Sequence, residues 1–101
     1  MNLEKRKPIR SKKITKAAEG EVCTICGLPS ETVVFCHLNE SWAGKGMKLK
    51  ADDIAGFFAC QQCHDVYDGR SGYDTISDYV VLRAVYKTMR RLWDRGIIGE
   101  L

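Results

Sequence analysis

The chain has no hydrophobic run that could cross a membrane, and this absence sets the first limit on its function. Its apolar stretches fall far short of the ~20 residues that a bilayer-spanning helix needs. The first sixteen residues also lack the apolar stretch that a secretion signal requires. We therefore expect a cytoplasmic protein that does not bind membranes.

The chain is also short of residues with which to build a core. With 101 residues it forms one domain at most. A domain of this size buries only part of the surface that its unfolded chain exposes, so the core is thin. A hydrophobic content of 45% nevertheless excludes a wholly disordered chain. Additional stabilisation is therefore expected.

The odd number of cysteines argues against a disulfide framework. In a reducing compartment, cysteines are more often metal ligands than disulfide partners. Four of the five form two C-x-x-C pairs, and the fifth is left over. The pairs are Cys23 with Cys26 and Cys60 with Cys63, and the remaining residue is Cys36.

The two C-x-x-C pairs predict a structural zinc site. Structural zinc takes four tetrahedral ligands, commonly thiolates, and the backbone of a C-x-x-C turn folds so that both sulfurs reach one metal. Zinc would add folding free energy on the order of 10 kcal/mol, which a thin core needs. A redox-active C-x-x-C or a cluster without metal are the alternatives, and neither accounts for two pairs. A thiol switch at Cys36 is a third interpretation.

Local patterns predict an α+β fold. Alternating apolar residues indicate strands, while caps and helical periodicity indicate helices. A zinc knuckle, a β-hairpin and a helix that carries the last two ligands make a treble clef. The predicted elements are a short helix at 11–19, strands at 32–37 and 54–59 joined by a loop at 38–53, a helix at 60–69, and a long helix at 74–95.

Basic residues concentrate near the start of the chain. Residues 1–16 carry seven basic residues and one acidic residue, a net charge of +6, whereas the other residues sum to −3. We therefore divide the chain into a basic, disordered arm at 1–15 and one domain at 16–101. Such an arm fits a polyanion such as nucleic acid, although a solvated tail is the alternative.

The long helix carries a second group of basic residues. They recur at i, i+4, i+7 and i+8, which aligns them along the helix. This stripe is either a solvated face or a surface that meets DNA. Its residues are Arg83, Lys87, Arg90 and Arg91.

Histidine is scarce: the chain has only two, and both follow a cysteine. His64 shares a helix face with Asp68 at i+4, while Cys63 lies about 100° away toward the zinc. His37 ends the first strand, and a hairpin laid on the helix would bring it opposite His64. Otherwise His64 caps its helix and His37 is a core or surface residue.

These three residues suit phosphodiester hydrolysis. One histidine can take a proton from water. The other histidine and the carboxylate can hold a divalent ion that polarises the phosphate. The sequence therefore makes His37, His64 and Asp68 candidate catalytic residues.

The pattern C-x2-C…H…C-x2-C-H resembles the zinc-stapled branch of the HNH, or ββα-metal, nucleases. The chain is also similar to a family of small phage and prophage proteins typified by YbcO, which are described as nucleases. The resemblance covers residues 16–71. Its matching parts are residues 16–23, the strand ending in His37, Gly46 with Lys50 and Asp53, and residues 59–70.

The resemblance implies an HNH-like site. His37 would be the general base, and His64 would bind a catalytic Mg²⁺ or Mn²⁺, with Asp68 and Asp53 as supporting groups. Many HNH nucleases have an acidic ligand directly before the base histidine, where this chain has Cys36. A thiol is a poor ligand for Mg²⁺, so a carboxylate takes its place, or the metal is softer, or the site is not catalytic.

The function implied is a metal-dependent endonuclease of phage recombination or DNA processing in the bacterial cytoplasm. The alternative is a non-catalytic zinc module that binds DNA or a phage replication partner. Contacts to DNA would be made with phosphates, and a homodimer is left open. The predicted DNA contacts are Lys12, Lys13, Lys16, Lys45, Lys48, Lys50 and Arg70.

Overall fold

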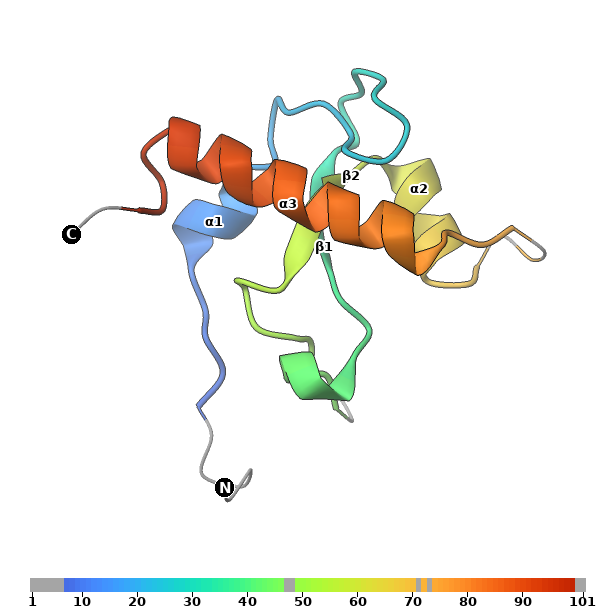
Figure 1. Ribbon diagram of the computed structural model, residues 1–101, viewed down its shortest axis with the longest axis horizontal. Coiled ribbons are helices and arrows are strands. Elements are labelled where there is room, and N and C mark those ends of the chain that lie inside the picture. Colours follow the sequence, from blue (N-terminus) through green and yellow to red (C-terminus); the bar gives the residue numbers. More distant parts are fainter. Residues whose placement is uncertain (1–6, 47–48, 71, 73, 100–101) are drawn as a thin grey trace.

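The computed structural model describes residues 7–46, 49–70, 72 and 74–99. A two-stranded hairpin lies at its centre, and the long C-terminal helix crosses in front of it in Figure 1. The predicted α+β fold is therefore confirmed. The elements are α1 (Lys12–Lys16), β1 (Val34–His37), the 3₁₀ helix η2 (Ser41–Ala43), β2 (Gly56–Ala59), α2 (Gln61–Tyr67) and α3 (Asp78–Asp94).

The hairpin is antiparallel and shorter than the sequence predicts. Val34 lies opposite Ala59, and His37 lies opposite Gly56. Gly56 is required at its position, because a Cβ there would lie 2.4 Å from the carbonyl oxygen of Cys36. Each strand begins two residues later than predicted. His37 lies at the last position of β1, where the loop to β2 begins.

The core lies where α3 packs on β2. Phe57 and Phe58 of β2 are fully buried, as are Thr88 and Leu92 of α3. The Phe58 amide donates a hydrogen bond to the Thr88 hydroxyl at 2.9 Å. A free strand edge is thereby paired with a helix side chain, which satisfies a backbone donor that burial would otherwise leave without a partner.

The exposed side of α3 differs from the prediction. Apolar residues at helical spacing ordinarily form one side that packs on the core, and Leu92 does lie in the core. Four others are exposed: Tyr79, Leu82, Tyr86 and Trp93. The helix therefore has one buried and one exposed apolar side, and the helical spacing of apolar residues does not distinguish the two. It also begins at Asp78, because the Ser77 hydroxyl accepts a hydrogen bond from the Val80 amide.

Part of the predicted arm packs on the domain. The Ser11 side chain caps α1, and Ile14 is buried. The Ile9 amide donates to the Asp52 carboxylate at 3.1 Å, and the Arg10 guanidinium donates to the Ala51 carbonyl at 2.8 Å. Residues 9–11 therefore contact the segment that precedes β2. The charge of the arm did not indicate these contacts, because each joins a charged side chain to a backbone group within the protein rather than to a polyanion.

Some of the predicted residues fall outside the part of the chain that the structure describes. Residues 1–6 of the predicted arm and the predicted DNA contact Lys48 lie outside the described residues. Within the described residues, no helix combines the length and apolar character needed to span a membrane.

Candidate metal centre and catalytic site

The four paired cysteines come together from two parts of the fold. Cys23 and Cys26 lie in a knuckle that is closed by a bridge between Val22 and Pro29. Cys60 is the residue before α2, and Cys63 lies in its first turn. All four sulfur atoms lie within 4.8 Å of one another. The predicted ligand set is thus assembled at the junction of knuckle and helix.

The spacing of these sulfurs fits a zinc ion. A Zn–S bond of ~2.3 Å in a tetrahedral site places neighbouring sulfurs about 3.8 Å apart. The Cys26 and Cys60 sulfurs are 4.0 Å apart. The cluster could therefore hold Zn²⁺ as the sequence predicts.

The electrostatics of the cluster also suit a cation. Burial by itself raises the pKa of Cys23, but hydrogen bonds from backbone amides, including that of Cys26, lower it to about 7. Burial and the neighbouring sulfurs raise the pKa of Cys63. Four thiolates so close together repel one another, and a divalent ion removes that repulsion.

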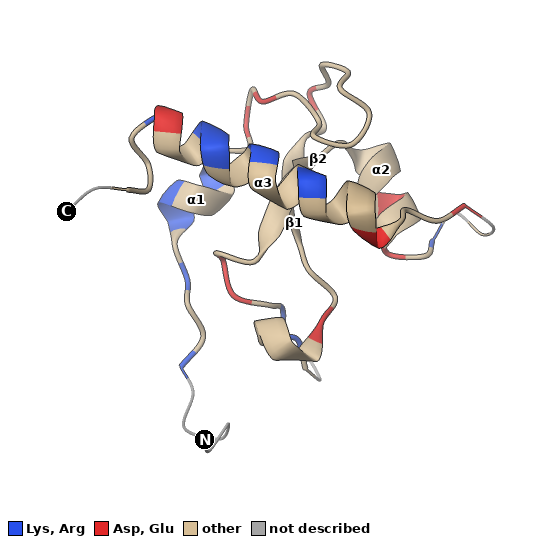
Figure 2. Cartoon of the chain, viewed as in Figure 1, with Lys and Arg blue, Asp and Glu red and all other residues tan. Residues whose placement is uncertain are grey.

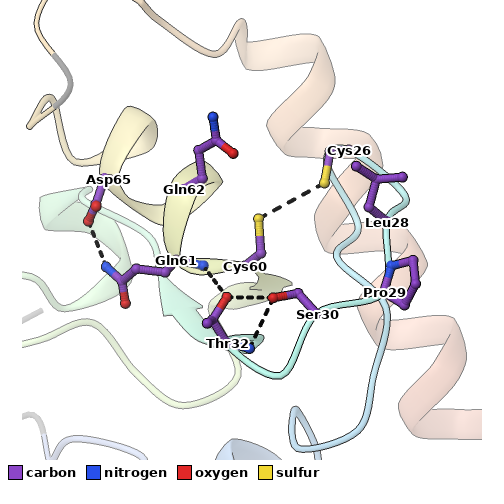
Figure 3. Close-up of a pocket in the computed structure, with 9 residues that line it drawn as sticks. All are labelled: Cys26, Leu28, Pro29, Ser30, Thr32, Cys60, Gln61, Gln62 and Asp65. Atoms are coloured by element: carbon purple, nitrogen blue, oxygen red, sulfur yellow. Dashed lines mark hydrogen bonds between the residues drawn. The ribbon is translucent and has the colours of Figure 1, made fainter.

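The start of α2 leaves the Cys60 sulfur available for metal. A residue at this position usually caps the helix with its side chain, but Cys60 makes no such hydrogen bond. Instead the Thr32 hydroxyl accepts from the Gln61 amide at 3.0 Å and pairs with the Ser30 hydroxyl at 2.7 Å. Figure 3 shows this arrangement in a pocket of about 510 Å³ beside the Cys26 and Cys60 sulfurs.

His37 forms a closely held pair with Asp53. Its Nε2 lies 2.7 Å from Oδ1 of Asp53, whose side chain is only 5% exposed. A carboxylate only accepts hydrogen bonds, so Nε2 carries a proton, and in the neutral imidazole the lone pair is on Nδ1. The edge of the Phe35 ring, 5.0 Å away between centroids, supports the imidazole.

Asp53 is held in its ionised form. Burial by itself raises the pKa of its carboxyl, but hydrogen bonds from His37 and from the Ser11 amide outweigh burial and lower the pKa. The Ser11 amide donates to Oδ2 at 2.7 Å, and the Arg10 guanidinium lies 3.7 Å from Oδ1. The start of α1 therefore contributes to the surroundings of His37.

His64 forms a second pair with Asp68 on α2. Its Nε2 lies 3.1 Å from Oδ2 of Asp68, and both side chains are partly exposed. The Asn39 side-chain amide donates to the other carboxylate oxygen at 2.9 Å. The Asn39 backbone amide donates to the Tyr67 hydroxyl at 3.0 Å. Because Asn39 follows His37 by two residues, it joins the end of β1 to the end of α2.

The candidate residues are therefore arranged as two His–Asp pairs. Within the described part of the chain, the cysteine cluster is the only group of three or more His, Cys, Asp or Glu side chains close enough to hold one metal ion. The sequence did not indicate that Asn39 or Ser11 belongs to the site, because neither is part of a motif. At Ser11 the sequence shows only the pattern of a helix cap, which predicts the start of α1.

Cys36 is buried and stays protonated. Burial, together with the charge of Asp68, raises the pKa of its thiol to about 12. A neutral, buried thiol is unreactive, which disfavours the redox switch. Since neighbouring side chains on a strand point to opposite faces, Cys36 and His37 do not share a face of β1.

The predicted DNA contacts that the structure describes are all exposed. They are Lys12, Lys13, Lys16, Lys45, Lys50 and Arg70. In the predicted stripe on α3, however, Arg91 turns inward and donates to the Val22 carbonyl at 2.8 Å. Figure 2 shows the basic positions that recur along α3 and those of α1.

Comparison with known proteins gave two matches. A family model described as "Putative nuclease YbcO" matches residues 12–97, which include the cysteine cluster and both His–Asp pairs. Among solved structures, the chain is similar to one titled "Structure of a putative bacteriophage protein from Escherichia coli str. K-12 substr. MG1655". The TM-score is 0.61 at 25% identity, over 82% of this chain and 99% of that one. No curated protein matches.

Proposed function

Because the chain belongs to the YbcO family, we propose that it is a metal-dependent endonuclease that hydrolyses DNA phosphodiester bonds in phage recombination or DNA processing. The observation that carries the proposal is the presence of two His–Asp pairs: His37–Asp53 at the loop end of the hairpin and His64–Asp68 on α2, where Asn39 links the segment after β1 to Asp68. The order of knuckle, hairpin and helix supports an HNH-like, treble-clef interpretation.

His37 is suited to the role of general base. Its Nε2 proton is held by Asp53, which leaves the Nδ1 lone pair to take a proton from the attacking water. The imidazolium that forms is stabilised by the buried carboxylate, as in other base–carboxylate pairs. The His37 side chain is 16% exposed, so water can reach part of it.

His64 and Asp68 are suited to hold a divalent ion. Two adjacent ligands of an octahedral ion at ~2.1 Å lie about 3.0 Å apart, and the Nε2 and Oδ2 atoms are 3.1 Å apart, so an ion could take the place of the proton that the two atoms share. Mg²⁺ and Mn²⁺ commonly use few protein ligands, with water and phosphate completing the shell. When bound, such an ion polarises the phosphate and stabilises the leaving oxygen. Asn39 fixes the Asp68 carboxylate for this role.

The cysteine cluster would act as a structural zinc site. Zinc on Cys60 and Cys63 would fix the first turn of α2, and thereby the position of His64 one residue later. Rigid support of this kind keeps a hydrolytic site in its productive geometry. The exposed lysines of α1 and of the loop before β2 would bind DNA phosphates without reading sequence.

One observation favours the non-catalytic alternative. Within the described residues, no third His, Cys, Asp or Glu side chain joins the His64–Asp68 pair closely enough to complete a protein-bound metal site. A zinc module that only binds DNA or a replication partner would need no second metal site.

The test is cleavage of supercoiled plasmid and of branched DNA by the full-length protein with Mg²⁺ or Mn²⁺. Nicking by the wild type, lost in His37→Ala and in His64→Ala, supports the proposal. Gln62→Ala is the matched control, since Gln62 is an exposed residue of the same helix, and it should cleave normally. DNA binding without cleavage by the wild type would favour the non-catalytic module.

A further inference from the structure

The exposed side of α3 carries an unusual row of large apolar residues. Tyr79, Leu82, Tyr86 and Trp93 are 70%, 69%, 66% and 54% exposed. At about 100° per residue they fall within one narrow sector of the helix. A contiguous row of this size in water marks a binding surface rather than chance exposure. We call it the aromatic row.

The charge beside the aromatic row is mainly positive, although Asp94 at its end pairs with Arg90 at 3.2 Å. Between Tyr79 and Trp93 the chain has four basic residues and no acidic one. Arg91 turns inward, and the other three are exposed next to the row: Arg83, Lys87 and Arg90. Figure 2 shows the basic positions following one another along α3. The Arg83 guanidinium lies 6.0 Å from the centre of the Tyr79 ring.

We propose that this side of α3 binds unpaired, single-stranded DNA. The rings of the aromatic row would stack on bases, and Arg83, Lys87 and Arg90 would meet the phosphates. Aromatic side chains beside a basic track are the means by which proteins hold single strands. This inference rests on the proposed nuclease function and extends it, because it names single-stranded or branched DNA as the substrate class.

The spacing of the rings favours an unpaired strand. Tyr79 and Tyr86 are seven residues apart, about 10 Å along the helix axis. Stacked bases in duplex DNA follow one another every ~3.4 Å, and their faces are covered by their neighbours. Each tyrosine can therefore take a base only from a strand whose bases have separated.

A second copy of this chain is the main rival occupant. Tyr79, Leu82, Tyr86, Met89 and Trp93 alternate at three and four residues, which is the spacing of a coiled-coil seam. The flanking positions, however, carry Arg83 and Arg90, and the acidic residues near them are Asp78 and Asp94, of which Asp94 pairs with Arg90 at 3.2 Å. The exposed basic residues still outnumber the acidic ones, which matches a polyanion better than an identical helix.

The test measures binding by fluorescence anisotropy with a labelled oligo-dT of about 20 nucleotides and no added Mg²⁺ or Mn²⁺, so that cleavage plays no part. Tyr79→Leu/Tyr86→Leu keeps the apolar seam but removes both rings. It should weaken binding on the order of tenfold for each ring. Tyr79→Phe/Tyr86→Phe keeps the rings and should bind like the wild type.

Substitution of the basic residues gives an independent test. Arg83→Gln/Lys87→Gln should reduce the salt dependence of oligo-dT binding by about 1.4 in the log–log slope, at ~0.7 per lost phosphate contact. The proposal fails if the leucine variant binds oligo-dT as well as the wild type. It also fails if duplex DNA or oligo-U binds more tightly than oligo-dT. A dimer in sedimentation that the leucine variant preserves, with unchanged DNA affinity, would assign the row to a second copy.

Failure of this proposal is distinguishable from failure of the nuclease proposal. A wild type that binds oligo-dT through the tyrosines but cuts no DNA would contradict only the nuclease function. A wild type that nicks plasmid but shows no ring-dependent binding would contradict only the single-strand site.

Discussion

Replacing Asp53 with asparagine tests the structure around the proposed base. Asn keeps the shape of the side chain but loses the charge and turns one acceptor into a donor. The carboxylate accepts two hydrogen bonds at 2.7 Å, from His37 and from the Ser11 amide. A hydrogen bond to a charged group contributes about 1 kcal/mol more than a neutral one, and a buried donor left without an acceptor costs about 1–3 kcal/mol.

We therefore expect Asp53→Asn to lower the free energy of unfolding by about 2–3 kcal/mol at pH 7. For a domain of this size that corresponds to a fall in melting temperature of about 10–20 °C. Circular dichroism melts of the zinc-loaded protein measure it. Asp65→Asn, at a more exposed carboxylate on α2, is the control and should change stability by no more than about 0.5 kcal/mol.

The pH dependence of the free energy of unfolding tests whether ionised Asp53 stabilises the fold. The folded-state pKa of Asp53 lies below its ordinary value, so its ionised form stabilises the fold. That contribution is complete above the unfolded-state pKa of ~3.9 and is lost as pH falls through the folded value. The gap between wild type and Asp53→Asn should therefore not shrink between pH 7.5 and pH 5. Equal stability at pH 7, or a gap that shrinks by pH 5, would refute the reasoning.

Three further predictions concern zinc, the second pair and the arm. Cys63→Ala should lose zinc and unfold, as elemental analysis and circular dichroism would show; a folded protein without zinc would contradict this. His64→Ala should keep zinc and stability within about 1 kcal/mol but lose Mn²⁺ binding, measured by calorimetry, and DNA cleavage; loss of zinc would instead place His64 in the structural site. Deleting residues 1–8, which removes three basic residues, should keep the fold and reduce the salt slope on duplex DNA by up to about 2.7, and an unchanged slope would show a solvated tail. Deleting residues 1–13 should also destabilise the domain, because Ser11 contacts Asp53.

The parts of the fold that the sequence predicted are those with local signals. Two C-x-x-C pairs indicated the cysteine cluster, β-branched and aromatic residues indicated the hairpin, and the i, i+4 spacing placed His64 beside Asp68. Each of these depends on residues close in sequence or on a motif with strict geometry. The order of elements followed from the same signals.

The parts that were not predicted depend on contacts between distant segments. His37 and Asp53 are 16 residues apart, and the path of the loop between them decides whether they meet. Asn39 reaches Asp68 across 29 residues. On α3, apolar residues recur at helical spacing on both the buried and the exposed side. Only the packing of the helix on β2 shows which of the two sides is buried.

The most direct measurement of the central claim is the rate of plasmid nicking by wild type and by His37→Ala with Mn²⁺ at pH 7.5. A general base contributes about 10²–10⁴-fold, so the variant should be slower by at least about a hundredfold. Its Mn²⁺ affinity should be unchanged, because His37 is paired with Asp53 rather than with the proposed metal ligands. A variant that nicks DNA as fast as the wild type would contradict the account.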